Sequence, residues 1–275
     1  MEELFRKITL DAVDIPGMPD VAIKVLALLE DELSSLRKME TLILDDQALT
    51  ANILKIANAP FYQTGKSITT LSEAIMAIGM HNMVALVSVI SLINQLSGKD
   101  LDPTLIHHAM AVSSASALLA RHAKIVTEEE ALVAGLLHDI GKTVLSANAP
   151  ARYKALNEKI KRERRSSFEA EEELFGVNHC RIGSLVAHKW KLPEIYDYTI
   201  MNHHNEEIKH FTSSQTIEYK DLLCYIVRMA DKVVLDAGVG VGKSTEKNPQ
   251  ALLDTLKVGE SVYVEIIRKI SVYCA

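Results

Sequence analysis

Apolar residues recur at helical spacing along most of the chain, and this periodicity restricts the fold more than any other feature. The segments VAIKVLALLEDEL, residues 21–33, and LTANILKIANAPF, residues 49–61, both place apolar residues three or four positions apart. This spacing gives an α-helix one apolar face and does not fit the alternation of a strand. Alternating runs joined by hairpin turns are absent from the sequence. We therefore predict an all-α fold, built as a two-lobed helical bundle.

The length of 275 residues suffices for one large domain. The polar stretch SGKDLDP, residues 97–103, follows an apolar helix and is the best internal boundary. We predict a single domain over residues 1–275, with an N-terminal helical lobe at 1–98 and a metal-binding lobe at 99–275.

The composition is that of an ordinary globular protein, with 48% hydrophobic and 24% charged residues. A net charge of -6 and a pI near 5.9 argue against a protein that coats nucleic acid. Residues 1–16 contain scattered charges, and no apolar stretch reaches the ~18 residues that span a bilayer. We expect a cytoplasmic protein with no membrane partner. Its three cysteines should be reduced thiols. They are Cys180, Cys224 and Cys274.

The stretch GLLHDIGK, residues 135–142, places His138 beside Asp139 after an apolar run. Thr127 and Glu130 form a capping-box pattern that predicts the start of the helix carrying this stretch. A buried polar pair is costly unless it has partners. Two adjacent residues lie about 100° apart on a helix. Both could then reach one cavity only from the helix edge, where Asp139 could bridge two ions.

Further histidines lie on or at the ends of predicted helices, tens of residues apart. They are His108, His179, His203 and His204. Helices of a bundle often each contribute one inward ligand to a shared site. Imidazoles with a few carboxylates suit borderline divalent metals such as iron, manganese, cobalt, nickel or zinc. The residues alone leave open the alternative of scattered, unrelated histidines.

The series His108, His138-Asp139 and Asp231 resembles the HD superfamily of helical metal-dependent phosphohydrolases. The segments IPGMPDVAIKVLALLEDE, LILDDQALTANILKIANAPFY and ITTLSEAIMAIGMHNMVALV resemble the HDOD family more closely. This is an HD-related output domain of bacterial signalling proteins. The later segment EEELFGVNHCRIGSLVAHKWKLPEIYDYTIMNHH also fits, so the resemblance covers roughly residues 10–235.

The resemblance implies a site for two divalent transition-metal ions. Its ligands would be His108, His138, Asp139, His179, His203, His204 and Asp231. If the site is catalytic, the resemblance assigns the central roles to Asp139 and Lys142. The metals would lower the pKa of a bridging water, and Lys142 would neutralise the substrate phosphate. Arg181 is a weaker phosphate candidate.

Two departures separate this chain from the HD-GYP phosphodiesterases of the superfamily. Asn205 stands where that pattern has a glutamate after the paired histidines, and the GYP motif is missing. Thr104 replaces a glutamate one turn before His108. Hydrolysis of a cyclic dinucleotide in the HD-GYP manner is therefore not expected.

Several residues near these motifs have simpler interpretations. Lys142 could extend into solvent from a helix end, where a cation suits the dipole. His107 should point about 100° away from His108, and Cys180 should face away from His179. GVGVGK, residues 238–243, lacks the spacing of a phosphate-binding loop and is expected to be flexible. The basic segment 158–167 is expected to be a solvated helix end and loop.

Three functions remain open at this point. The first is an HDOD-type regulatory protein that retains two metals and acts through its helical surface. The second is an active phosphohydrolase for a nucleotide or other phosphoester. The third is a scaffold without metal. The sequence shows no receiver, sensor or DNA-binding motif, so we expect regulation to depend on a signalling partner chain or a small phosphate ligand.

Overall fold

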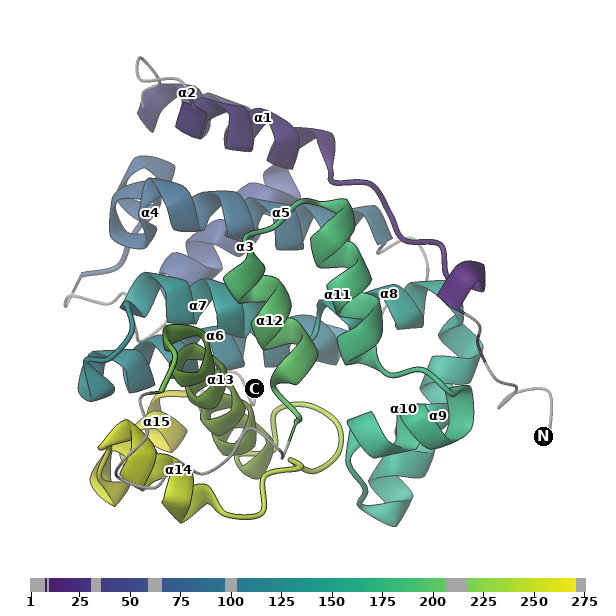
Figure 1. Ribbon diagram of the computed structural model, residues 1–275. Coiled ribbons are helices and arrows are strands. Elements are labelled where there is room, and N and C mark those ends of the chain that lie inside the picture. Colours follow the sequence, from purple (N-terminus) through teal and green to yellow (C-terminus); the bar gives the residue numbers. More distant parts are fainter. Residues whose placement is uncertain are drawn as a thin grey trace. The chain divides into compact units, whose positions relative to one another are not determined.

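The structure is a computed structural model that describes residue 8 and residues 10–30, 36–58, 66–96, 103–205 and 217–270. All regular secondary structure in these ranges is helical, which confirms the all-α prediction (Figure 1). None of the described helices is both long enough and apolar enough to cross a membrane. The elements are η2 (Leu10–Ala12), α1 (Asp20–Glu30), α2 (Leu36–Leu44), α3 (Gln47–Ala57), α4 (Leu71–Ile78), α5 (Met80–Leu96), α6 (Pro103–Ala123), α7 (Glu128–Leu137), α8 (Ile140–Asn148), α9 (Pro150–Glu163), α10 (Ser167–Phe175), α11 (His179–Lys189), α12 (Glu194–Asn202), α13 (Tyr219–Asp236), α14 (Pro249–Leu256) and α15 (Glu260–Ile270).

The chain divides into two compact units, as expected for a two-lobed bundle. One is Gly17–Gly98, and the other combines Met1–Pro16 with Lys99–Ala275. Hydrogen bonds explain why residues before Gly17 belong to the second unit. Lys189 Nζ donates to the Ile15 carbonyl at 2.6 Å, and Trp190 Nε1 donates to the Pro16 carbonyl at 3.1 Å. The assignment of both lobes to one domain stays a prediction.

The unit Gly17–Gly98 contains α1 to α5. α1 begins directly after Pro19, and the first turn of α4 is closed by a capping box between Thr70 and Glu73. α5 packs against α1 and α3. The largest side chains in this unit that are less than 2% exposed form its core. They are Met39, Ile43, Leu49, Ile53, Ile75, Met83, Leu86 and Leu92.

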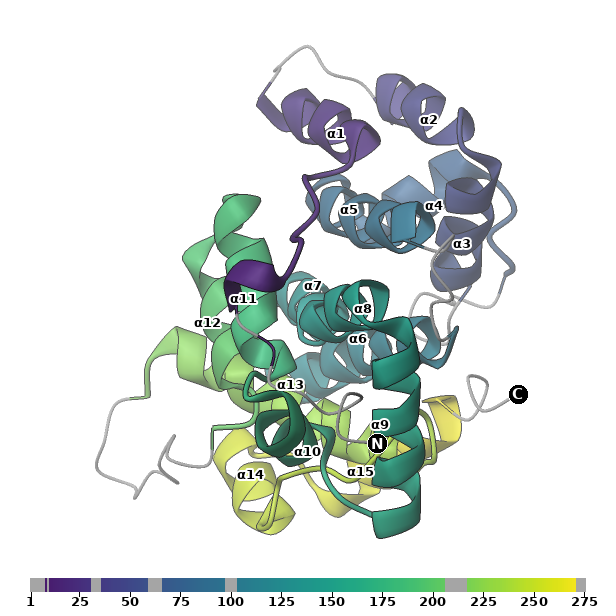
Figure 2. The same ribbon diagram turned by 90° about the vertical axis from the view of Figure 1, so that its right-hand side faces the viewer.

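The second unit contains α6 to α15. α6 packs against α7 and α13, while α11 packs against α8 and α12 (Figures 1 and 2). Val112, Ala115 and Leu119, which follow His108 at helical spacing on α6, are fully buried. These packed helices form the frame that carries the predicted ligands.

The capping box predicted before α7 is only half formed. Thr127 Oγ1 accepts a hydrogen bond from the Glu130 amide at 3.2 Å, as predicted. The Glu130 carboxylate does not return to the Thr127 amide, which donates instead to the Tyr219 hydroxyl at 3.1 Å. A residue from α13 therefore replaces the local partner.

The prediction of one continuous helix through GLLHDIGK is wrong. α7 ends at Leu137 and α8 begins at Ile140, so His138 and Asp139 form the junction between two helices. Asp139, with φ -103° and ψ 15°, occupies the N-cap position of α8 but makes no capping hydrogen bond with its side chain. Because the carboxylate does not cap the helix, it is available to groups outside it.

Gly141 allows α8 to approach α11 more closely than any side chain would permit. A Cβ atom at this position would lie 1.9 Å from the His179 carbonyl oxygen and 2.7 Å from the Gly183 amide nitrogen. Both are backbone atoms, which a local side-chain rotation cannot move away. The contact therefore fixes the start of α8, with Asp139 just before it, against the start of α11.

The substitution Gly141→Ala should force α8 and α11 apart. We expect the free energy of unfolding to fall by about 3 kcal/mol, the upper range for overpacking. Urea denaturation followed by circular dichroism measures this change. Gly259→Ala is the matched control, since a Cβ atom at this position would lie 3.7 Å from its nearest neighbour, Ser261 Oγ. Equal denaturation midpoints for the two variants would contradict the close contact.

Candidate metal centre

The structure brings all seven predicted ligands together in two buried groups. Within each group the candidate ligand atoms lie within 4.8 Å of one another. The first group is Asp139, His179, His203 and His204, and the second is His108, His138 and Asp231.

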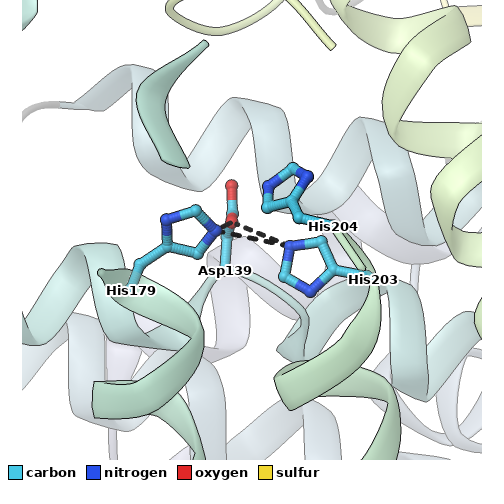
Figure 3. Close-up of side chains that lie close together, drawn as sticks. All are labelled: Asp139, His179, His203 and His204. Carbon is cyan, nitrogen blue, oxygen red and sulfur yellow. Dashed lines mark hydrogen bonds and ion pairs between the residues drawn. The ribbon is translucent and has the colours of Figure 1, made fainter. Parts of the chain in front are cut away.

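The ligands come from separate elements of the second unit. His108 lies on α6, His179 begins α11, and Asp231 lies on α13. His203 and His204 directly follow α12. Figure 3 shows the first group, in which the rings of His179 and His203 point toward the Asp139 carboxylate with His204 beside them. The site therefore exists only when these helices are packed.

The Asp139 carboxylate faces both groups. Its Oδ1 lies 3.2 Å from His179 Nε2 and 3.7 Å from His203 Nε2. Its Oδ2 lies 3.3 Å from Nε2 of both His108 and His138. Oδ1 therefore faces the first group and Oδ2 the second. A carboxylate that bridges two cations has this arrangement. The second carboxylate, Asp231, places Oδ1 3.1 Å from His108 Nε2.

Backbone carbonyls set the orientation of three imidazoles. A carbonyl can only accept, so the facing Nδ1 carries the proton and the Nε2 of the neutral ring offers its lone pair to the site. The pairs are His108 Nδ1 with Val239 O at 3.0 Å, His138 Nδ1 with Gly135 O at 2.7 Å, and His203 Nδ1 with Ile200 O at 2.9 Å.

A buried carboxylate that the sequence did not reveal orients His179. Glu171 Oε2 lies 2.6 Å from His179 Nδ1 and accepts from the His179 amide at 2.8 Å. Tyr153 donates to its other oxygen at 3.2 Å. A carboxylate behind a ligating imidazole raises the basicity of the ring and fixes its orientation. Glu171 lies in the acidic run EAEEE, where nothing distinguishes it from solvated neighbours.

The glycine-rich segment 238–243, expected to be a flexible loop, contacts the site directly. Gly240 has φ +113°, and a Cβ there would lie 2.6 Å from His108 Nδ1. Thr245 Oγ1 lies 3.0 Å from His204 Nδ1. A buried ion pair of 2.8 Å between Arg228 and Glu246 anchors the following residues. The segment after α13 therefore supports one imidazole in each group.

Several buried atoms at the centre have no hydrogen-bonding partner within the described ranges. Such atoms are costly to bury unless another group compensates them. A cation between them would compensate all of them at once, and imidazoles with carboxylates suit borderline divalent metals. The residues present therefore fit a pair of such ions. The atoms are His108 Nε2, His138 Nε2, Asp139 Oδ1, His204 Nε2 and Asp231 Oδ1.

The two carboxylates of the centre are held in the ionised form. Burial raises the pKa of Asp139, but the charges of His138 and Lys142 more than offset this and bring it well below its usual value. Burial likewise raises the pKa of Asp231, but the His108 imidazole, 3.1 Å away, lowers it further than burial raises it. Ionised carboxylates are the form that binds metal ions.

The imidazoles differ in protonation. Burial lowers the pKa of His203, and it lowers the pKa of His204 far below its ordinary value, so both rings are neutral near pH 7. Burial also acts to lower the pKa of His108, but the carboxylates of Asp139 and Asp231 outweigh it and raise the pKa to about 9. A metal ion that binds His108 must therefore displace its proton.

Lys142 lies at the edge of the centre, and the alternative that it extends into solvent is wrong. It is 6% exposed, and its Nζ lies 2.6 Å from Asp139 Oδ2. It occupies the first turn of α8, the helix end where the dipole disfavours a cation. Burial lowers the pKa of Lys142, but the Asp139 charge more than offsets this and raises it overall. The lysine is thus a buried cation beside the bridging carboxylate.

Cys180, expected to face elsewhere than His179, is not among the candidate ligands of either described group, but it lies beside His203. Its Sγ is buried and lies 3.8 Å from His203 Nδ1. Burial raises the pKa of this thiol well above its ordinary value, so it is protonated. Arg181, the weaker phosphate candidate, is exposed. His107 lies outside both groups of described candidate ligands. Cys274 lies outside the described residues.

Comparison with known proteins places the chain in a family. Residues 15–206 match the family model described as the HDOD domain. The chain belongs to the HDOD domain family. This HDOD chain is 28% identical over 199 residues to an uncharacterized protein of Treponema pallidum (strain Nichols). The match covers 70% of this chain and 38% of the relative, so the chain spans well under half of that protein's length.

Solved structures share the HDOD fold. An HDOD domain protein of unknown function from Geobacter sulfurreducens has a TM-score of 0.70 and 22% identity, with 96% of this chain and 95% of that chain covered. A protein from Shewanella amazonensis SB2B is named as a candidate metal-dependent phosphohydrolase. Its TM-score is 0.65 and its sequence identity 18%, with 96% of this chain and 93% of that chain covered. A protein from Marinobacter aquaeolei VT8 is named as a candidate signal transduction protein. Its TM-score is 0.71 and its sequence identity 19%, with 94% of this chain and 58% of that chain covered.

The substitution Glu171→Gln tests the support behind His179. We expect metal affinity to fall about 10–100-fold, because the amide binds the imidazole less strongly than the carboxylate. Competition with a chromophoric chelator measures the affinity. Glu158→Gln, which alters an exposed carboxylate of α9, should leave the affinity unchanged. Wild-type affinity in both variants would show that Glu171 does not support a metal ligand.

Proposed function

We propose that this HDOD protein is a regulatory protein that retains a dinuclear centre for divalent transition metals. The observation that carries the proposal is the Asp139 carboxylate, with one oxygen 3.2 Å from His179 Nε2 and the other 3.3 Å from His138 Nε2. The oriented lone pairs and unpartnered buried atoms support it. A scaffold without metal would bury these atoms with nothing to compensate them.

Each ion would have its own set of imidazoles, and Asp139 would belong to both. His108, His138 and Asp231 would hold one ion, and His179, His203 and His204 the other. Iron, manganese, nickel, cobalt and zinc all accept this donor set. When bound, two such ions supply Lewis acidity and lower the pKa of a water molecule.

The regulatory part of the proposal is supported by the family and by the Marinobacter protein, which is named as a candidate signal transduction protein. We propose that the protein acts in the cytoplasm through a separate signalling protein or a small phosphate ligand. A ligand bound at the metal centre can shift the conformational equilibrium of such a protein only if it binds one conformation more tightly than another.

Metal content measured by plasma mass spectrometry tests the dinuclear centre. We expect about two ions per chain after purification without chelator. Asp139→Asn should lose both ions because the bridging carboxylate belongs to both sets, and His204→Ala should retain about one. His188→Ala, an exposed histidine paired with Asp197 at 2.8 Å, is the control. Equal metal content in Asp139→Asn and wild type, at unchanged helix content, would contradict the proposal.

A second candidate function, hydrolysis of a phosphate ester, is favoured by Lys142. A buried ammonium 2.6 Å from Asp139 Oδ2 places positive charge beside the carboxylate shared by the two groups. Such a preorganised charge stabilises negative charge that develops during phosphoryl transfer. The Shewanella protein, named as a candidate metal-dependent phosphohydrolase, shares the fold. Thr104 and Asn205 depart from the HD-GYP pattern. The proposed substrate is therefore a phosphate ester other than the cyclic dinucleotide that HD-GYP enzymes hydrolyse.

Lys142→Met tests the catalytic role. In the metal-loaded protein we expect kcat/KM for p-nitrophenyl phosphate or its bis-ester to fall about 100-fold or more, as when one preorganised donor is removed. Metal content should remain at the wild-type level. Lys161→Met, an exposed lysine of α9, is the control. Absence of hydrolysis by the loaded wild type would reject this candidate and leave the regulatory proposal standing.

A further inference from the structure

Two cavities border the metal centre, and they differ greatly in size. The cavity beside Lys142 and Gly240 has a volume of about 10 Å³. That is the space of roughly one water molecule. The cavity beside His204 has a volume of about 500 Å³. Small-molecule sites usually measure roughly 300–1,000 Å³. Of these two cavities, only the one beside His204 can admit an organic ligand as the structure stands.

The larger cavity, which we call the α10–α12 cleft, is formed by three helical segments. Phe168 and Glu172 come from α10, Asn178 and Arg181 from the start of α11, and Met201 from the end of α12. These segments also carry or support ligands of the first group. The cleft is therefore part of the same packed frame as the metal centre.

His204 connects the cleft to the centre. It is 93% buried, since its exposed fraction is 7%, and its Nε2 has no hydrogen-bonding partner among the described residues. The same residue lines the cleft. The ring of Phe168 lies 5.2 Å from the His204 ring and 6.2 Å from the His179 ring. A ligand in the cleft would thus meet an aromatic wall and the His204 edge of the centre together.

The cleft carries charge and amides as well as apolar surface. Arg181 is exposed and makes no ion pair with any residue in the described ranges. The carboxylate of Glu172 also borders the cleft and accepts from Asn178 Nδ2 at 2.7 Å. Met201 is 43% exposed. A phosphate suits the arginine. The planar face of a base suits Phe168 and Met201.

We propose that the α10–α12 cleft binds a mononucleotide, with its phosphate between Arg181 and the His204 edge of the centre and its base against Phe168 and Met201. The inference rests on the proposed function because His204, one of the candidate metal ligands, lines the cleft. Lys142 contacts the Asp139 carboxylate at the smaller cavity, away from the residues that line the cleft. The carboxylate of Glu172 and the Asn178 amide provide polar partners for the edge of the base.

Fluorescence anisotropy with N-methylanthraniloyl AMP and GMP tests the cleft without requiring turnover. The full chain is titrated both after manganese loading and after chelator treatment, and metal content is measured on the same samples. We expect binding of at least one nucleotide, with a dissociation constant about tenfold higher in Arg181→Glu. Arg162→Glu, whose side chain is 75% exposed on α9, is the matched charge reversal and should bind as the wild type does.

The outcomes separate this inference from the proposed function. Two metals per chain with no nucleotide binding would overturn the cleft and leave the metal centre standing. Binding that depends on Arg181 in a protein that takes up no metal would support the cleft and overturn the dinuclear centre. Equal weakening by Arg181→Glu and Arg162→Glu would overturn the cleft as a specific site. If inorganic phosphate displaced the labelled nucleotide with the same affinity as the unlabelled nucleotide, the cleft would also be overturned as a nucleotide site. The base would then contribute nothing to the binding affinity.

Discussion

The structure depends on holding the ionised Asp139 carboxylate between two groups of imidazoles in a buried position. An isolated buried carboxylate is too costly, so the surroundings must supply positive charge and oriented donors. The chain meets this need by breaking the helix at His138 and by leaving Asp139 without a capping role. Gly141 then fixes the junction against α11 through backbone contact. The packing of α8 against α11 and the charges around Asp139 therefore both hold this carboxylate in place.

Much of the fold and the ligand set could be predicted from the sequence. The helical periodicity correctly predicted the all-α fold, and the start of α7 followed from Thr127. The seven residues predicted as ligands lie in two close groups. They could be named from the sequence because their types and order resemble a known pattern. Local rules failed at the α7–α8 junction, since the break follows from contact between helices distant in the sequence. Glu171 and the Val239 carbonyl were missed for the same reason.

The two sides of the centre suggest a division of roles. Beside Lys142 the segment after α13 closes the cavity to about 10 Å³ and supports His108 through the Val239 carbonyl. Beside His204 the cavity opens to about 500 Å³. A closed side preserves the strength of the Lys142–Asp139 ion pair by excluding water. An open side admits a ligand without disturbing that pair. A regulatory protein and a hydrolase could both use this arrangement.

Electron paramagnetic resonance of the manganese-loaded protein tests most directly whether Asp139 joins two ions. Ions bridged by one carboxylate would lie roughly 3.5–4 Å apart and interact magnetically. The account predicts a broadened, exchange-coupled spectrum at full loading. The spectrum of isolated manganese, unchanged in shape up to full loading, would show that the ions bind apart and would contradict the account.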